Sequence, residues 1–130
     1  MAIFLKKKLE VIDKIDNVNF IEQIDNTKPH VKVGILNLMP TLEDTERQLI
    51  VALDNPVVQI ELDFIYLDTK NKDSEKLAYF KKYYKSFQEI KNEHYDGMMV
   101  TGAPLEHIPY INVDYIEELK EFFKYTKSNV

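Results

Sequence analysis

"VKVGILNLMPTLEDTERQL" (residues 31–49) decides the fold of this chain. Its first eight residues are mostly apolar, which predicts a buried strand over 31–38. Pro40 ends that strand, because proline cannot donate a hydrogen bond within a sheet. Thr41 and Asp44 then have the spacing of a capping box, in which two side chains satisfy free amides at the start of a helix. The stretch therefore predicts a strand followed directly by a helix.

Strands and helices continue to alternate along the chain. Residues 57–67 are rich in Val, Ile and aromatic residues, which predicts a second strand. From Ser74 the apolar residues recur at steps of three and four, which predicts one continuous helix through Leu77, Phe80, Tyr84, Phe87 and Ile90. Residues 97–101 predict a third strand, and 113–126 a last amphipathic helix. This order predicts an α/β fold with a parallel sheet covered by helices. By analogy with related folds, strand 31–38 is expected to lie between the other two.

Composition limits the possible functions. The chain has 130 residues, of which 45% are hydrophobic and 30% charged, as in one soluble globular domain. A net charge of −5 argues against nucleic acid as a partner. With no cysteine and three scattered histidines, we expect no metal and no tightly bound cofactor. The sequence shows neither a secretory signal nor a membrane span, so we expect a cytoplasmic protein with no membrane partner. Residues 1–30 are expected to form an N-terminal arm, within which residues 11–24 form either a short helix or a segment that packs on the sheet edge.

Ligands of parallel α/β folds bind beyond the carboxyl ends of the strands, which here means the loops at 38–42, 67–74 and 102–112. The first of these loops has no glycine, which excludes a dinucleotide fingerprint. The helix after it begins with acidic residues that repel a flavin phosphate. A phosphoacceptor receiver would need an aspartate where this chain has Thr101. The common nucleotide-binding functions are therefore excluded.

The turn that follows the third strand is the candidate site. Its small residues would let backbone amides approach a ligand and bind a developing oxyanion; they are Thr101, Gly102, Ala103 and Pro104. The alternative is that glycine and proline merely end the strand. Glu106 is either part of the site or a solvated loop acid, and His107, with no nucleophile in sight, is better explained as a surface histidine, as are His30 and His94. The same edge should also carry Asn37, Tyr66 and Asp68.

Three segments resemble the N-terminal half of the homoserine O-acyltransferase family of methionine biosynthesis. They are "LNLMPTLEDTERQL" (36–49), "YDGMMVTGAPLE" (95–106) and "VDYIEELKEFFKYTKSNV" (113–130). The resemblance extends over residues 18–130 and implies a three-layer, flavodoxin-like sheet of the class I glutamine amidotransferase type. Residues 31–130 would form the N-terminal part of that domain, ending before the strand that carries the family's nucleophile.

The resemblance also implies a chemistry. Family members use a cysteine that takes the acyl group from acyl-CoA, a histidine base and a glutamate that orients it. All three would follow the segment that resembles "YTKSNV", so we expect no catalytic residue within this chain and no activity from the chain alone. The loop of Gly102, Ala103, Pro104 and Leu105 resembles the oxyanion and acyl-pocket loop. The substrates implied are acyl-CoA and homoserine, and the resemblance allows a homodimer in the full-length enzyme.

Glu106 matches the family position associated with the choice of acyl donor, where glutamate goes with acetyl-CoA and glycine with succinyl-CoA. A carboxylate there fills the volume of the longer chain and repels the succinyl carboxylate. The resemblance therefore favours homoserine O-acetyltransferase, with acetyl-CoA as co-substrate. Homoserine O-succinyltransferase activity is an alternative. Serine as the acceptor is another, because Thr41 and Leu42 replace two lysines of the family and residues 74–79 replace a second family pattern near the same edge.

A hypothesis of another class is a stand-alone, noncatalytic α/β module that binds a small molecule or a partner. It differs from the acyltransferase hypothesis in what lies downstream of codon 130. An acyltransferase gene should continue there into a strand that carries a cysteine.

Overall fold

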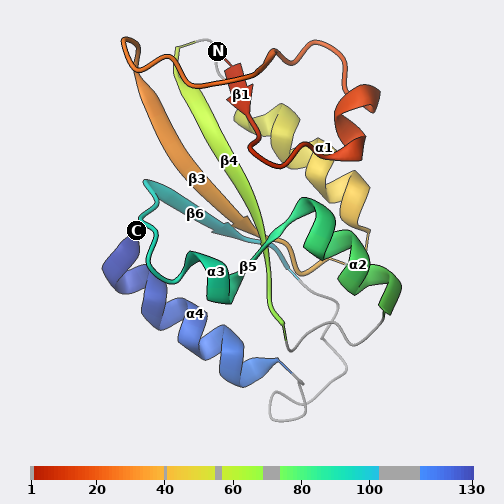
Figure 1. The fold of residues 1–130 in the computed structure, drawn as a ribbon, viewed down its shortest axis with the longest axis vertical. Coiled ribbons are helices and arrows are strands. Elements are labelled where there is room, and N and C mark those ends of the chain that lie inside the picture. The colour runs from red at the N-terminus through yellow and green to blue at the C-terminus, as the bar shows by residue number, and fades with distance from the viewer. Residues whose placement is uncertain (1, 40, 55–56, 69–73, 103–114) are drawn as a thin grey trace.

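The computed structural model describes residues 2–39, 41–54, 57–68, 74–102 and 115–130. It contains a parallel sheet with helices around it (Figure 1). The strands are β1 (Ala2–Phe4), β2 (Phe20–Ile21), β3 (His30–Leu36), β4 (Gln59–Tyr66), β5 (Lys85–Ser86) and β6 (Gly97–Val100). The helices are the 3₁₀ helix η1 (Glu10–Lys14), α1 (Leu42–Leu53), α2 (Ser74–Tyr83), α3 (Phe87–Ile90) and α4 (Ile116–Asn129).

The strand order within the described residues is β2-β1-β4-β3-β6, and the short β5 pairs with the carboxyl end of β4. Strand β3 pairs with β4 over its whole length, from His30 opposite Gln59 to Leu36 opposite Ile65. The prediction that the strand from 31 lies between the other two is confirmed. The α/β fold class is confirmed as well, and the arrangement is consistent with part of a flavodoxin-like domain.

Two hydrophobic cores lie on the two faces of the sheet. The first contains Ile35 and Phe64 of the sheet, and helices α1, α2 and η1 pack against it. The second contains Leu36 and Ile65, which are the next residues along the same strands, with α3 and α4. Alternate residues of a strand point to opposite faces, so both faces of β3 and β4 are covered. Within the part of the chain that the structure describes, no helix is long and apolar enough to cross a membrane.

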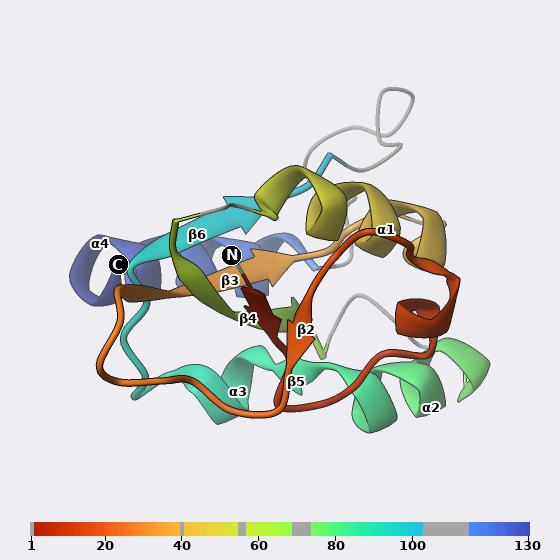
Figure 2. The ribbon, with the colours of Figure 1, turned by 90° about the horizontal axis from the view of Figure 1, so that it is seen from above.

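The prediction of one helix from Ser74 to Ile90 is wrong. Helix α2 ends at Tyr83, and β5 separates it from α3. Phe80 and Tyr84 belong to the first core, whereas Phe87 and Ile90 belong to the second. A straight helix cannot place one apolar stripe on both faces of a sheet, so the chain crosses the sheet edge in an extended segment. Figure 2 shows α2, β5 and α3 following one another along one flank.

One capping box was predicted from spacing, at Thr41 and Asp44, and the spacing was misleading there. Thr41 makes no side-chain bond at the start of α1, because its backbone (φ −94°, ψ 79°) is not extended as a cap requires. The box predicted there is therefore wrong. A complete box is present at α3, where the Glu89 amide donates to Ser86 Oγ at 3.2 Å and the Ser86 amide donates to Glu89 Oε1 at 3.1 Å. This second box stabilises the new helix start directly after β5.

The N-terminal residues extend the sheet. Strand β1 pairs with β4 on one side and with β2 on the other. Ile3, Leu9 and Val11 are buried in the first core. The ammonium of Lys7 donates to the backbone oxygen of Tyr84 at 2.7 Å, at the point where the chain leaves α2. This segment is therefore part of the hydrophobic core that supports α1 and α2.

Candidate functional site

The carboxyl edge of the sheet brings together the turns that follow β3 and β6. The Thr101 amide donates to the Leu36 carbonyl at 3.1 Å, and the Leu38 amide donates to Thr101 Oγ1 at 2.7 Å. Two sequence motifs that lie 63 residues apart are thereby joined. Gly102 follows at once and is exposed, and no described atom would lie within 4 Å of a Cβ placed on it. The turns that follow β3 and β6 therefore meet at the carboxyl edge, next to Gly102.

The rest of the predicted acyl-pocket loop lies outside the part of the chain that the structure describes. Ala103, Pro104, Leu105 and Glu106 lie outside the described residues, as does His107. Their roles stay predictions. Gly102 is the one residue of the predicted loop that the structure describes, and it lies at the expected edge.

Asn37 is a polar residue at this edge, and it is almost wholly buried. Its Oδ1 accepts from the Met39 amide at 3.1 Å, and its Nδ2 donates to the Tyr84 hydroxyl at 2.9 Å. The side chain therefore holds the turn that follows β3 and connects it to the end of α2. The sequence placed Asn37 at this edge correctly, but no pattern connected it with Tyr84.

Glu46 of α1 is fully buried, and sequence reasoning missed it as part of a network. Its carboxylate accepts from the Tyr84 hydroxyl at 2.5 Å and from the Tyr79 hydroxyl at 2.9 Å. Burial raises the pKa of Glu46 above its usual value, although the two hydroxyl groups act in the opposite direction. Burial, followed by the charge of Glu46, raises the pKa of both tyrosines. In the sequence Glu46 was indistinguishable from an acid that favours the start of a helix.

The raised pKa of Glu46 predicts a pH dependence of stability. In the window between its usual pKa and its raised native pKa, the folded protein binds more protons than the unfolded chain. The contribution of Glu46 to the free energy of unfolding therefore falls as pH rises through this window. Glutamine cannot titrate, so we expect the Glu46→Gln variant to gain stability relative to the parent protein with rising pH. Urea unfolding of both proteins from about pH 4 to pH 8 measures this. A stability difference that does not change with pH would contradict it.

The other residues predicted at this edge behave differently from one another. Tyr66 is buried, and its ring stacks on Phe80 with centroids 5.0 Å apart, so it serves the first core. Asp68 is exposed as a residue, but partial desolvation of its carboxyl, followed by the charges of Glu118 and Glu89, raises its pKa. The histidines at 30 and 94 are exposed near the amino ends of β3 and β6, away from this edge.

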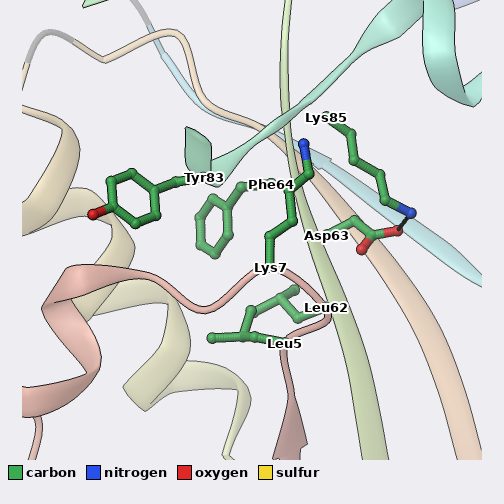
Figure 3. Close-up of a pocket in the computed structure, with 7 residues that line it drawn as sticks. All are labelled: Leu5, Lys7, Leu62, Asp63, Phe64, Tyr83 and Lys85. Atoms are coloured by element: carbon green, nitrogen blue, oxygen red, sulfur yellow. Dashed lines mark hydrogen bonds and ion pairs between the residues drawn. The ribbon is translucent and has the colours of Figure 1, made fainter. Parts of the chain in front are cut away.

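Among the described residues, two cavities lie away from this edge. The first is beside β4, in the gap between β1 and β5, and Figure 3 shows the residues around it: Leu5, Lys7, Leu62, Asp63, Phe64, Tyr83 and Lys85. Its volume of about 10 Å³ is enough for roughly one water molecule. The second is an open groove of about 370 Å³ along α3 and α4, lined by Phe87, Tyr125 and Asn129 among others. Asn129 accepts from the Tyr95 amide just before β6 begins, so this groove lies toward the amino ends of the strands. Neither cavity belongs to the candidate site.

A parallel sheet with helices on both faces is an α/β fold, consistent with part of a flavodoxin-like domain. Proteins of this class bind ligands at the carboxyl edge of the sheet, where two turns are joined in this chain. Residues 3–130 match the protein family described as homoserine O-succinyltransferase. The chain belongs to this family, whose members are acyltransferases of methionine biosynthesis. The family predicted from the three sequence motifs is thereby confirmed.

Curated relatives agree with this assignment. The chain is similar to the homoserine O-acetyltransferases of Streptococcus pneumoniae strains CGSP14 and JJA, with 36% identity over 135 residues in each case. Each alignment includes 100% of this chain and 43% of the relative. The chain therefore spans less than half the length of the curated relatives that it matches.

Proposed function

We propose that this chain is the N-terminal part of a homoserine O-acetyltransferase. In the proposed reaction the thioester C–S bond of acetyl-CoA breaks, an ester C–O bond forms on the homoserine hydroxyl, and the hydroxyl proton leaves with the CoA thiol. The observation that carries the proposal is the 2.7 Å bond between the Leu38 amide and Thr101 Oγ1. It joins two of the motifs on which the family resemblance rests, at the edge where α/β proteins bind ligands.

The donor is proposed to be acetyl-CoA. The pneumococcal relatives are named as acetyltransferases, and Glu106 is expected to exclude a succinyl group by its volume and its charge. Homoserine is the proposed acceptor. Serine is the alternative, because this chain has Thr41 and Leu42 where the family has two lysines. We also propose that the protein needs no metal or tightly bound cofactor, acts in the cytoplasm and forms a homodimer at full length.

The test of the proposed function uses two proteins. One is the 130-residue chain, and the other, here termed the extended protein, joins residues 1–130 to the remaining C-terminal part of a pneumococcal relative. We expect the extended protein to release CoA from acetyl-CoA when homoserine is present. The 130-residue chain should release none above the uncatalysed rate, because it contains no thiol that could form an acyl-enzyme. Turnover by the 130-residue chain, lost on substitution of Glu106, would show that the mechanism is different.

The role of Glu106 in donor choice can be measured in the extended protein. Replacing Glu106 with glycine removes both volume and charge, so kcat/KM for succinyl-CoA should rise relative to acetyl-CoA by roughly 10- to 200-fold, the scale of a pocket effect. The Glu106→Gln variant is the matched control, since it removes the charge and keeps the volume. An intermediate shift for this control is expected. If neither variant changes the preference, Glu106 is only a solvated loop acid.

A further inference from the structure

The Met39 amide, in the turn after β3, determines how the Asn37 side chain is oriented. The backbone amide of Met39 can only donate, so Asn37 must present its oxygen to it, at 3.1 Å. This leaves the Asn37 nitrogen facing the Tyr84 hydroxyl, at 2.9 Å. An amide nitrogen also only donates, so the Tyr84 oxygen must accept this bond. The proton of Tyr84 therefore has to be donated to another group.

Glu46 accepts the hydrogen bond from the Tyr84 hydroxyl. The Tyr84 oxygen lies 2.5 Å from Glu46 Oε2, a distance typical of a hydroxyl that donates to a carboxylate. Both side chains are fully buried. A buried hydroxyl without an acceptor is costly, so the direction of the whole chain depends on the presence of an acceptor at residue 46.

We propose that Glu46 is a positioning residue for the site at the carboxyl edge. Its acceptor oxygen fixes the direction of the hydrogen bonds through Tyr84 and Asn37, and so holds the Met39 amide and the turn at 37–39. The Leu38 amide in the middle of this turn is the group that bonds to Thr101 Oγ1, next to Gly102. The contacts thus extend from the interior of α1 to the start of the proposed acyl-pocket loop. The catalytic consequence rests on the proposed acyltransferase function.

An acceptor, and not a charge, is what this role requires. With an apolar residue at 46, the Tyr84 proton would turn toward Asn37, whose amide would rotate to present its oxygen to Tyr84. The Asn37 nitrogen would then face the Met39 amide, and two donors would oppose each other. Glutamine would avoid this outcome, because its carbonyl can accept from Tyr84 while its nitrogen donates to the Tyr79 oxygen.

The test compares three variants of the extended protein. Glu46→Met removes the acceptor at similar volume, and Glu46→Gln keeps one. Tyr79→Phe is the matched control, since it removes the other hydroxyl bonded to Glu46 and leaves the bonds to Tyr84 and Asn37 intact. Hydrogen exchange at the Met39 amide, followed by mass spectrometry, should be at least about tenfold faster in Glu46→Met and little changed in the other two variants.

Kinetics give the second readout. Glu46→Met should lower kcat for acetyl transfer by roughly 10- to 100-fold with little change in the KM for acetyl-CoA, because the turn is misplaced and donor binding is not removed. Glu46→Gln should restore the parental kcat. If Glu46→Met does not fold, Tyr84→Phe gives a second test: it leaves the buried Asn37 nitrogen without its acceptor, which should loosen the hold of Asn37 on the Met39 amide and make exchange there faster.

Unchanged exchange at Met39 in Glu46→Met or in Tyr84→Phe would overturn the proposal. An equal loss of protection in Glu46→Gln would overturn it as well, because the charge would then be the cause. If the parent extended protein transfers no acyl group, the proposed function fails, while the exchange measurement still decides whether Glu46 holds the turn.

Discussion

Replacing Lys85 with methionine should lower the free energy of unfolding by about 3–5 kcal/mol, the usual cost of leaving a buried charge without its partner. Lys85 Nζ lies 3.1 Å from Asp63 Oδ2, and the side chains are 14% and 3% exposed. In the variant the carboxylate of Asp63 would keep the Tyr95 hydroxyl, at 2.8 Å, but would lose its cation. Urea unfolding of the extended protein measures the difference.

Lys85 contacts a second acid, Glu93, in addition to Asp63. Its ammonium also lies 3.5 Å from Glu93, which Lys32 contacts at 2.6 Å. Burial alone would raise the pKa of Glu93, but the hydrogen bond from Lys32 and the charge of Lys85 hold that pKa below its usual value. Glu93 therefore keeps one cation in the variant, and the cost should fall mainly on Asp63.

Two further proteins identify the cause. Lys8→Met removes an exposed pair, in which Lys8 and Glu22 lie 3.1 Å apart and are 66% and 84% exposed, so little or no change is expected. The triple variant Asp63→Leu, Lys85→Met, Tyr95→Phe removes the buried charges together with the hydroxyl that would lose its acceptor. It should recover most of the stability, because apolar groups of similar volume replace buried ion pairs at little cost. A loss in Lys85→Met no larger than that in Lys8→Met would show that the buried pair does not contribute.

The 130-residue chain alone should self-associate through β6. This strand is the last in the sheet order, and within the described residues it pairs with β3 on one side only. Val100 on this strand is 39% exposed, and Phe123 of α4 is 45% exposed. An unpaired strand edge recruits other chains, and each large apolar side chain left exposed forgoes roughly 1.5–3 kcal/mol. We therefore expect concentration-dependent light scattering and a broad unfolding transition for the chain alone.

A charge on β6 distinguishes pairing through this strand from nonspecific association through other exposed apolar residues. Val100→Lys should reduce the light scattering of the 130-residue chain, because lysine on an edge strand opposes pairing between chains. Val57→Lys is the matched control, since Val57 is 71% exposed but precedes β4 and lies outside β6. The extended protein should be free of this association if its additional residues pair with β6. A monomeric 130-residue chain with a sharp transition would instead favour the stand-alone binding module.

Most of the sheet could be predicted because its signals are local. An apolar run that stops at a proline, a glycine or a polar loop marks a buried strand wherever the chain goes next, and this pattern located β3, β4 and β6. The short strands β1, β2 and β5 have two or three residues each, too few for any period to be visible. Their existence depends on the edge of β4, which only the folded chain provides.

The candidate site was also predicted only in part. Asn37 and Gly102 were expected at the carboxyl edge because strand ends meet there, and both are found there. The bonds of Glu46 to Tyr84 and of Tyr84 to Asn37 join residues 38 and 47 positions apart. No periodic pattern can connect positions so distant, and an acid in the first half of a helix is normally exposed.

The sequence by itself determined the α/β class, the central strands and the family of this protein, since each depends on short stretches whose meaning does not change with context. Only the tertiary structure decided where the helix predicted over 74–90 breaks and which acids are buried. Tyr84 is drawn toward Glu46 in the first core, and Phe87 toward Phe122 in the second. The helical stripe continues through both residues in the sequence, but the burial of their side chains on opposite faces of the sheet outweighs the local preference for a continuous helix.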